Sequence, residues 1–167
     1  MMYQLKPISP AGVTGALEKA ERYRLLNEPS EAESICRDVL AAQPGNQQAT
    51  IMLLLAITDQ FAEGAAEGER RARELLPQIE DDYKRSYYEG VICERRGRAH
   101  MRSARGGSGE LAHEWLTRAM QCYERAESLR PAGNDEAILR WNSCARMIDT
   151  RDHVRPGVAE AYEPSFD

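Results

Sequence analysis

The sequence contains few aromatic residues and no long apolar run. Phe, Trp and Tyr make up 7% of its 167 residues, whereas Ala, Leu, Glu and Arg dominate, a composition that favours helix over sheet. Because a run of about 18 consecutive apolar residues occurs nowhere, the sequence predicts no helix that spans a membrane. Residues 1–15 also lack the apolar run of a signal peptide, so we expect a cytoplasmic protein.

Acidic residues outnumber basic ones in this chain. The chain has 22 lysine and arginine residues against 27 aspartate and glutamate residues, which gives a net charge of -5. Nucleic acids and anionic membranes are both bound through a clustered positive field, so this deficit argues against either as a partner. A local basic patch stays compatible with the composition.

Motifs that bind metals or cofactors are missing. The zinc motif H-E-x-x-H begins at His113 and Glu114, but Thr117 stands where the second histidine is required. The glycine-rich segment 106–109 lacks the Lys-Ser/Thr of a phosphate-binding loop, and the three histidines lie outside any nucleophile motif. The sequence therefore predicts no metal, no cofactor and no enzymatic activity.

The cysteines form no C-x-x-C pair. They are widely separated along the chain, at Cys36, Cys93, Cys122 and Cys144. Small buried thiols in a reducing compartment are the expected state, and a metal or redox site is the alternative.

What the sequence does contain is a spacing that occurs three times. A small residue is followed by a site four positions later, an apolar or small residue three after that, and a proline five further on. The copies are Ala32, Cys36, Val39, Pro44; Ala65, Glu69, Ala72, Pro77; and Ala119, Tyr123, Ala126, Pro131. The first two copies lie 33 residues apart at all four positions, and the last two lie 54 apart. This constancy indicates a repeated helical hairpin.

A period near 34 with this pattern in the second helix resembles the tetratricopeptide repeat (TPR) family. The resemblance implies an all-α fold, a right-handed superhelical stack of three antiparallel helix hairpins plus a capping helix, with a concave surface for a partner. The pattern also looks like small bacterial three-repeat proteins. The implied parts are a domain over 1–149, with repeats at about 13–45, 46–79 and 80–131 and a capping helix at 134–148, and an irregular tail over 150–167.

The third hairpin is expected to be the longest. Gly90 and Gly97 match the family's two small positions, but Ala119 lies 22 residues beyond Gly97, where five is normal. The simplest interpretation lengthens each helix by about eight residues and joins the two through the glycines at 106–109. Within this fold, close helix contacts are expected at Ala32, Ala65, Ala119 and Ala126.

The resemblance also implies a binding groove. The family's groove-facing positions include Glu21, Arg24, Lys84, Tyr87, Arg95, Asn142 and Arg146. Members that bind the tails of heat-shock proteins carry Lys, Asn and Arg where this chain has Leu17, Glu21, Tyr87 and Val91, so binding of such a tail is disfavoured. For Tyr87, packing against neighbouring helices is as plausible as contact with a partner.

A basic stripe is the second candidate surface. Arg95, Arg98, Arg102 and Arg105 recur at helical spacing and fall within a sector of roughly 80° on one helix. Guanidinium groups pair bidentately with carboxylates and phosphates, so the stripe is suited to a carboxylate-rich or phosphorylated segment. The alternative is a solvated face, paired internally with Glu110 and Glu114 across the hairpin.

These patterns favour a non-enzymatic adaptor or scaffold that holds another protein or peptide segment in its groove. A secretion-type chaperone, and a structural subunit of a larger assembly or homo-oligomer, are the alternatives. The tail is open to two interpretations, since Tyr162 and Phe166 are aromatic residues in a polar segment. It either docks on a groove or forms a mobile terminus.

Overall fold

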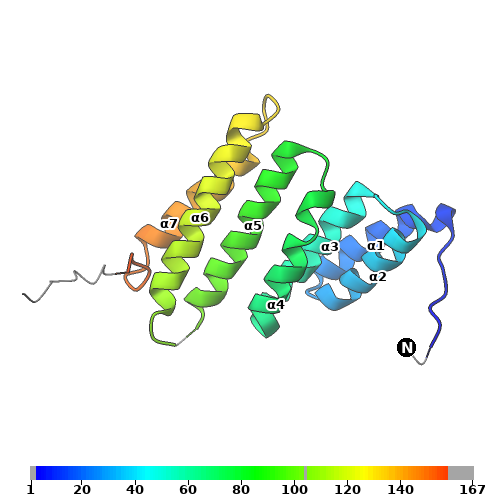
Figure 1. The fold of residues 1–167 in the computed structure, drawn as a ribbon, viewed down its shortest axis with the longest axis horizontal. Coiled ribbons are helices and arrows are strands. Elements are labelled where there is room, and N and C mark those ends of the chain that lie inside the picture. The colour runs from blue at the N-terminus through cyan, green and yellow to red at the C-terminus, as the bar shows by residue number, and fades with distance from the viewer. Residues whose placement is uncertain (1–2, 104, 158–167) are drawn as a thin grey trace, which may run out of the picture.

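A computed structural model describes residues 3–103 and 105–157, and all regular structure in these residues is helical (Figure 1). The α-helices are α1 (Val13–Leu25), α2 (Pro29–Ala42), α3 (Gln47–Asp59), α4 (Phe61–Arg73), α5 (Asp82–Met101), α6 (Ser108–Leu129) and α7 (Glu136–Asp149). Short 3-10 helices, η1 (Pro10–Gly12) and η2 (Leu76–Gln78), precede α1 and follow α4. The predicted all-α class is thus confirmed for this part of the chain, in which no helix is long and apolar enough to cross a membrane.

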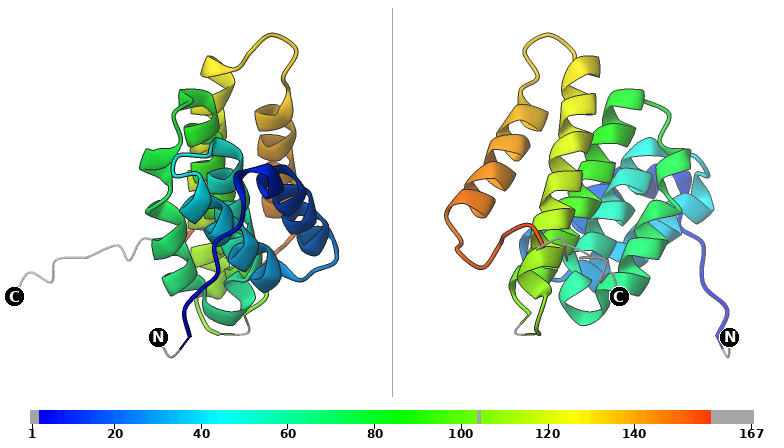
Figure 2. Two further views of the ribbon diagram at one scale, coloured as in Figure 1. Left: turned by 90° about the vertical axis from the view of Figure 1, so that its right-hand side faces the viewer. Right: turned by 60° about the vertical axis from the view of Figure 1, so that its left-hand side comes forward.

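The helices stack in sequence order, with α1 and α2 at one end of the molecule and α6 and α7 at the other (Figures 1 and 2). Each helix packs against the next along the chain, and the α5–α6 interface is the most extensive. Contacts also join α1 to α3 and α3 to α5. Alternate helices on this side of the stack are therefore close enough for their side chains to meet.

Local sequence signals explain where several helices begin. Pro29 is the first residue of α2, a position where its missing N–H leaves no bond unmade. Asn46 caps α3, because its side-chain oxygen accepts a hydrogen bond from the backbone N–H of Ala49 at 2.9 Å. Gly45 and Gly133 precede α3 and α7 with φ of 87° and 82°, a left-handed conformation that glycine adopts without strain.

Three hydrophobic clusters of buried residues lie in the described part of the stack, one of them between the first hairpin and α3. The other two are larger. One lies among α2, α3 and α4 and contains the fully buried Leu54 and Ile79. The other lies among α5, α6 and α7 and contains Leu116 and Tyr123, which are also fully buried. Tyr88 on α5 packs against both clusters, so the core is continuous from the second hairpin to the third.

The third hairpin is the longest, as predicted, with 20 residues in α5 and 22 in α6. Its two helices approach closely at the predicted glycines. A Cβ added to Gly90 would lie 2.6 Å from the ring of Tyr123, and one added to Gly97 would lie 2.9 Å from Leu116. Of the alanines predicted at close contacts, Ala32, Ala119 and Ala126 are fully buried and Ala65 is partly buried.

The segment after α7 packs against the third hairpin. Residues 151–157 contain no helix, but Val154 is 2% exposed and belongs to the cluster of α5, α6 and α7. A Cβ added to Gly109 would lie 1.9 Å from the carbonyl oxygen of His153, so α6 needs a glycine where this segment crosses it. Tyr162 and Phe166 lie outside the described residues.

Candidate functional site

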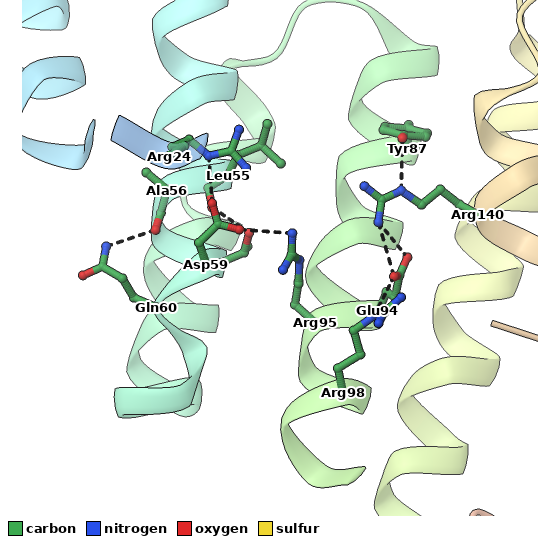
Figure 3. A network of polar contacts seen from close by, with 11 residues as sticks. Arg24, Leu55, Ala56, Asp59, Gln60, Tyr87, Glu94, Arg95, Arg98 and Arg140 are labelled. Carbon is green, nitrogen blue, oxygen red and sulfur yellow. Dashed lines mark hydrogen bonds and ion pairs between the residues drawn. The ribbon is translucent and has the colours of Figure 1, made fainter. Parts of the chain in front are cut away.

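A chain of charged contacts begins at Asp59 and joins α1, α3 and α5 (Figure 3). Arg24 of α1 donates a hydrogen bond from Nε to Asp59 of α3 at 2.8 Å. Arg95 of α5 lies 3.1 Å from the other carboxylate oxygen of Asp59. One carboxylate therefore binds an arginine from the helix on either side of it.

Arg95 is held in an unfavourable environment. Burial lowers the pKa of its guanidinium, and the Asp59 carboxylate acts in the opposite direction. Its Nε is buried and has no hydrogen-bond partner among the described residues. A buried donor without a partner is destabilising, and such atoms in native proteins often mark a place where a ligand or a water completes the bonding.

A second polar cluster surrounds Glu94, which is fully buried. The hydroxyl of Tyr123 donates to Glu94 at 2.7 Å, and Arg98 Nε donates at 2.9 Å. Arg140 of α7 lies 3.3 Å from both carboxylate oxygens, and its Nε donates to the hydroxyl of Tyr87 at 3.3 Å. Because an isolated buried carboxylate would be very unfavourable, these donors are what allow Glu94 to lie here.

The pKa values of the partners follow from this arrangement. Burial, followed by the charge of Glu94, raises the pKa of Tyr123, so its phenol stays a donor. Burial acts to lower the pKa of Arg140, but the charge of Glu94 opposes it, and the net pKa is raised. The cluster joins α5, α6 and α7 through these hydrogen bonds.

A pocket of about 350 Å³ opens beside this cluster, between the C-terminal ends of α5 and α7. Its lining residues are Arg98, Met101, Arg102, Ser143, Arg146, Met147, Thr150 and Arg151. We call it the arginine pocket, after its four arginines. Among the residues that line it there is no carboxylate, and the structure gives no ion pair to Arg102, Arg146 or Arg151 within residues 3–103 and 105–157.

The structure brings several of the predicted site residues together. Arg24 and Arg95 meet at Asp59, while Arg98, Arg102 and Arg146 line the arginine pocket. We refer to the Asp59 contacts, Arg140 and the arginine pocket together as the arginine face. It draws residues from α1, α3, α5 and α7.

Other predicted residues lie apart from this face. Glu21 and Lys84 are exposed, and Asn142 is half-buried; none of the three makes a side-chain hydrogen bond or ion pair with another described residue. Tyr87 is buried and packs against the rings of Tyr83, Tyr88 and Tyr123, so it is a core residue whose hydroxyl alone reaches Arg140.

The basic stripe is shorter than predicted. Helix α5 ends at Met101, so Arg102 is its C-cap and Arg105 lies in the loop before α6. The assignment of Arg105 to the helical stripe was therefore wrong. The backbone N–H groups of Arg102 and Ser103 bond to carbonyls of the last turn, which closes the helix there.

Internal pairing of the stripe takes a different form from the one expected. Glu114 pairs with Arg118 on its own helix, and the described residues show no ion pair from Glu110 or Glu114 to the stripe. Arg95 and Arg98 pair with Asp59 and Glu94 instead.

Sequence reasoning missed Asp59, Glu94, Arg140 and Arg151 as site residues. Glu94 and Arg98 stand four apart, the spacing of an ion pair along one helix, and this signal was available. Arg140 is 46 residues from Glu94. Nothing local indicates that pairing, since it depends on how α7 packs.

All four cysteines are free and buried. The guanidinium groups of Arg73 and Arg125 approach the sulfurs of Cys93 and Cys122 at 3.6 Å and 3.2 Å. No group of three or more metal-binding side chains occurs in the part of the chain that the structure describes.

Comparisons of the chain with protein-family models, with curated proteins and with solved structures find no match. The arginine face is therefore interpreted from its own chemistry. It presents guanidinium groups, methionine side chains and a hydroxyl, which suit recognition of an anionic group.

Proposed function

We propose that the protein is a TPR-like adaptor that holds an acidic segment of a partner protein against the arginine face. The repeated spacing of small residues and prolines supports the TPR-like arrangement. So do the helix contacts, because α1 meets α3 and α3 meets α5, whereas α2 and α4, and α4 and α6, contact each other less. A stack with closer contacts on one side curves toward that side, which makes the face of α1, α3 and α5 the concave one.

The observation that carries the proposal is the distribution of charge. A chain with a net charge of -5 gathers four arginines in a pocket whose described lining residues include no carboxylate. Such a concentration repels other cations and is stabilised by an anionic ligand, whose approach it also accelerates. A segment rich in Asp and Glu is the partner that this charge pattern complements.

Selection from a phage-displayed random peptide library tests the proposal. We expect the immobilised protein to enrich peptides rich in Asp and Glu, and the Arg102→Glu, Arg146→Glu double variant to lose that enrichment. The Lys19→Glu, Arg22→Glu variant is the matched control, since both residues are exposed on α1 and lie outside the arginine face. Enrichment without acidic residues, or enrichment that survives in the double variant, would contradict the proposal.

A structural subunit of a larger assembly is the second candidate. Leu25 and Leu26, at the end of α1, are 82% and 61% exposed. Apolar side chains at the end of a repeat stack are suited to contact a further subunit. Size-exclusion chromatography with light scattering separates the candidates, because a subunit of this kind self-associates and a Leu25→Gln, Leu26→Gln variant does not.

A further inference from the structure

We infer that the arginine pocket binds a phosphate monoester, carried as a phosphoserine or phosphothreonine side chain on the partner segment. The inference rests on the proposed function for the peptide part of the ligand. The phosphate part rests on the pocket alone, and it is argued from the charge, the donors and the size of the site.

The charge of the pocket exceeds what one carboxylate neutralises. Arg98 is bonded to Glu94, which it shares with Arg140. Arg102, Arg146 and Arg151 have no acidic partner among the described residues, so the pocket holds three uncompensated guanidinium groups. A phosphate monoester carries a charge of about -1.5 to -2 near pH 7, against -1 for a carboxylate, and it has three acceptor oxygens.

The hydrogen-bond donors of the pocket are available to a ligand. A guanidinium group has five N–H donors in a planar fork, and the described structure gives Arg102, Arg146 and Arg151 no side-chain hydrogen bond. The hydroxyl of Ser143 is likewise without a partner there, whereas the hydroxyl of Thr150 donates to the carbonyl of Arg146 at 2.6 Å. Three forks and one hydroxyl can bind the three oxygens of a phosphate from several sides.

The arginines lie near the C-terminal ends of α5 and α7, where they could instead serve to stabilise the helix ends. Cations there are favoured by the helix dipole, which also partly offsets the attraction of an anion. However, the last turns are closed by the backbone, with Arg102 N–H donating to Arg98 and Thr150 N–H donating to Arg146. Within the described part of the chain, no guanidinium of the pocket donates to a helix carbonyl, so capping leaves these donors unused.

The size and lining of the pocket fit a phosphate on a carrier. A volume of about 350 Å³ exceeds that of a phosphate group and leaves room for the side chain that bears it. Met101 and Met147 supply apolar, adaptable surface for that side chain. The occupant is thus expected to be a phosphorylated residue in preference to the free ion.

Titration of the protein with O-phosphoserine tests the phosphate part, with arginine Nε–H signals followed by NMR. At constant ionic strength we expect saturable shifts of the Arg102 and Arg146 signals, and affinity at least about tenfold above that for glutamate. The Arg102→Gln, Arg146→Gln variant is expected to bind about tenfold or more weakly. Equal responses to phosphoserine and glutamate, or full binding by this variant, would overturn the inference.

Two further variants control for non-specific charge effects and for loss of stability. Lys19→Gln, Arg22→Gln removes two positive charges from the outer surface of α1 and is expected to bind O-phosphoserine within about twofold of the parent, because screening weakens distant charges. Arg151 lies beyond the end of α7, so its replacement by Gln disturbs no helix. A loss of binding in Arg151→Gln therefore supports the phosphate site even if the double variant is destabilised. If Arg151→Gln and the double variant both bind O-phosphoserine as tightly as the parent, the phosphate site is contradicted.

A comparison of three probes tests whether the pocket recognises the phosphate alone or also the residue and peptide that carry it. Inorganic phosphate, O-phosphoserine and the peptide Ala-Ala-pSer-Ala-Ala should bind with increasing affinity. Equal affinity for all three would contradict the peptide part and leave a site for the free ion. Phosphoserine binding without selection of acidic peptides would support the phosphate site and contradict the proposed adaptor function. Selection of acidic peptides without phosphoserine binding would overturn the phosphate site and leave the adaptor function intact.

Discussion

Glu94 shows how a single residue determines the chemistry around it. Its carboxylate is buried beneath the arginine face, and it binds Arg98, Arg140 and Tyr123 from three different helices. The anion fixes the orientation of both guanidinium groups, one of which lines the arginine pocket. Arg98 is thereby ordered before any ligand binds, which lowers the part of the entropic cost of binding that comes from this side chain.

Replacing Glu94 by Gln should therefore destabilise the protein. The change leaves two partly buried guanidinium groups without their anion, and we expect a loss of about 1–3 kcal/mol in the free energy of unfolding. Urea denaturation followed by circular dichroism measures it. Glu114→Gln is the control, because Glu114 pairs with Arg118 on the surface of α6 and the loss of such an exposed pair should have little effect. Equal stability of the two variants would contradict the role of Glu94.

The buried thiols make a second prediction at this scale. Burial raises the pKa of Cys36 to about 11 and of Cys144 to about 12, so both stay protonated near pH 8. We expect Cys36 and Cys144 to react slowly with Ellman's reagent in the folded protein and at once in the unfolded protein. An added Ser30→Cys thiol, exposed on α2, is the control for fast reaction. Reaction of Cys36 or Cys144 at that rate would show their burial to be wrong.

The same shifts set a pH dependence of stability. Because the folded pKa values lie above the ordinary 9.0 of a thiol, the unfolded state loses these protons first as the pH rises. The contribution of the two thiols is therefore present below pH 9.0 and is lost as the pH rises through about 11 and about 12. The Cys36→Ala, Cys144→Ala variant should lack this part of the alkaline loss in urea titrations, and an unchanged slope would contradict it.

At the scale of elements, the third hairpin depends on glycines that let two long helices approach. Gly90 faces the ring of Tyr123, and Tyr123 is in turn fixed by its bond to Glu94. The ring therefore has little freedom to move away from a larger neighbour. The close approach of α5 and α6 and the position of Glu94 are in this way linked through one side chain.

A Gly90→Ala substitution tests this close approach. Alanine favours helix over glycine by about 1 kcal/mol, but the added Cβ would lie within 2.6 Å of the Tyr123 ring. We expect overpacking to prevail, with a net loss of about 1–3 kcal/mol in thermal or urea unfolding. Gly15→Ala on α1 is the matched control, since its Cβ meets nothing within 4 Å and should stabilise the helix. A Gly90→Ala variant as stable as Gly15→Ala would contradict the packing.

The elements were more predictable from the sequence than the site. Small residues act locally, so Gly90, Gly97 and the alanines of the repeated spacing predicted close contacts that the structure has. Pro29 and Asn46 stand where helices begin, for equally local reasons. The end of α5 at Met101 was missed because no glycine or proline follows before Gly106. The pairing of Glu94 with Arg140 depends on how helices distant in sequence pack, and no local pattern encodes that.

At the scale of the whole molecule, the chain end completes the core of the last hairpin. Val154 lies 2% exposed against α5, α6 and α7, beyond the end of the last helix. The segment that carries it also supplies Arg151 to the arginine pocket. Stability of the C-terminal part and the shape of the pocket are therefore expected to depend on the same few residues.

Two truncations separate these contributions. Ending the chain after Ile148 removes Val154 and should lower the free energy of unfolding by about 1.5–3 kcal/mol, the value of burying one valine side chain. Ending it after Gly157 keeps Val154 and Arg151, which makes it the reference for the shorter form. Because the residues removed include Glu160, Glu163 and Asp167, the longer truncated form should bind O-phosphoserine at least as tightly as the full chain. Equal stability of the two forms would contradict the packing of Val154, and weaker phosphoserine binding after Gly157 would assign the removed residues a part in the site.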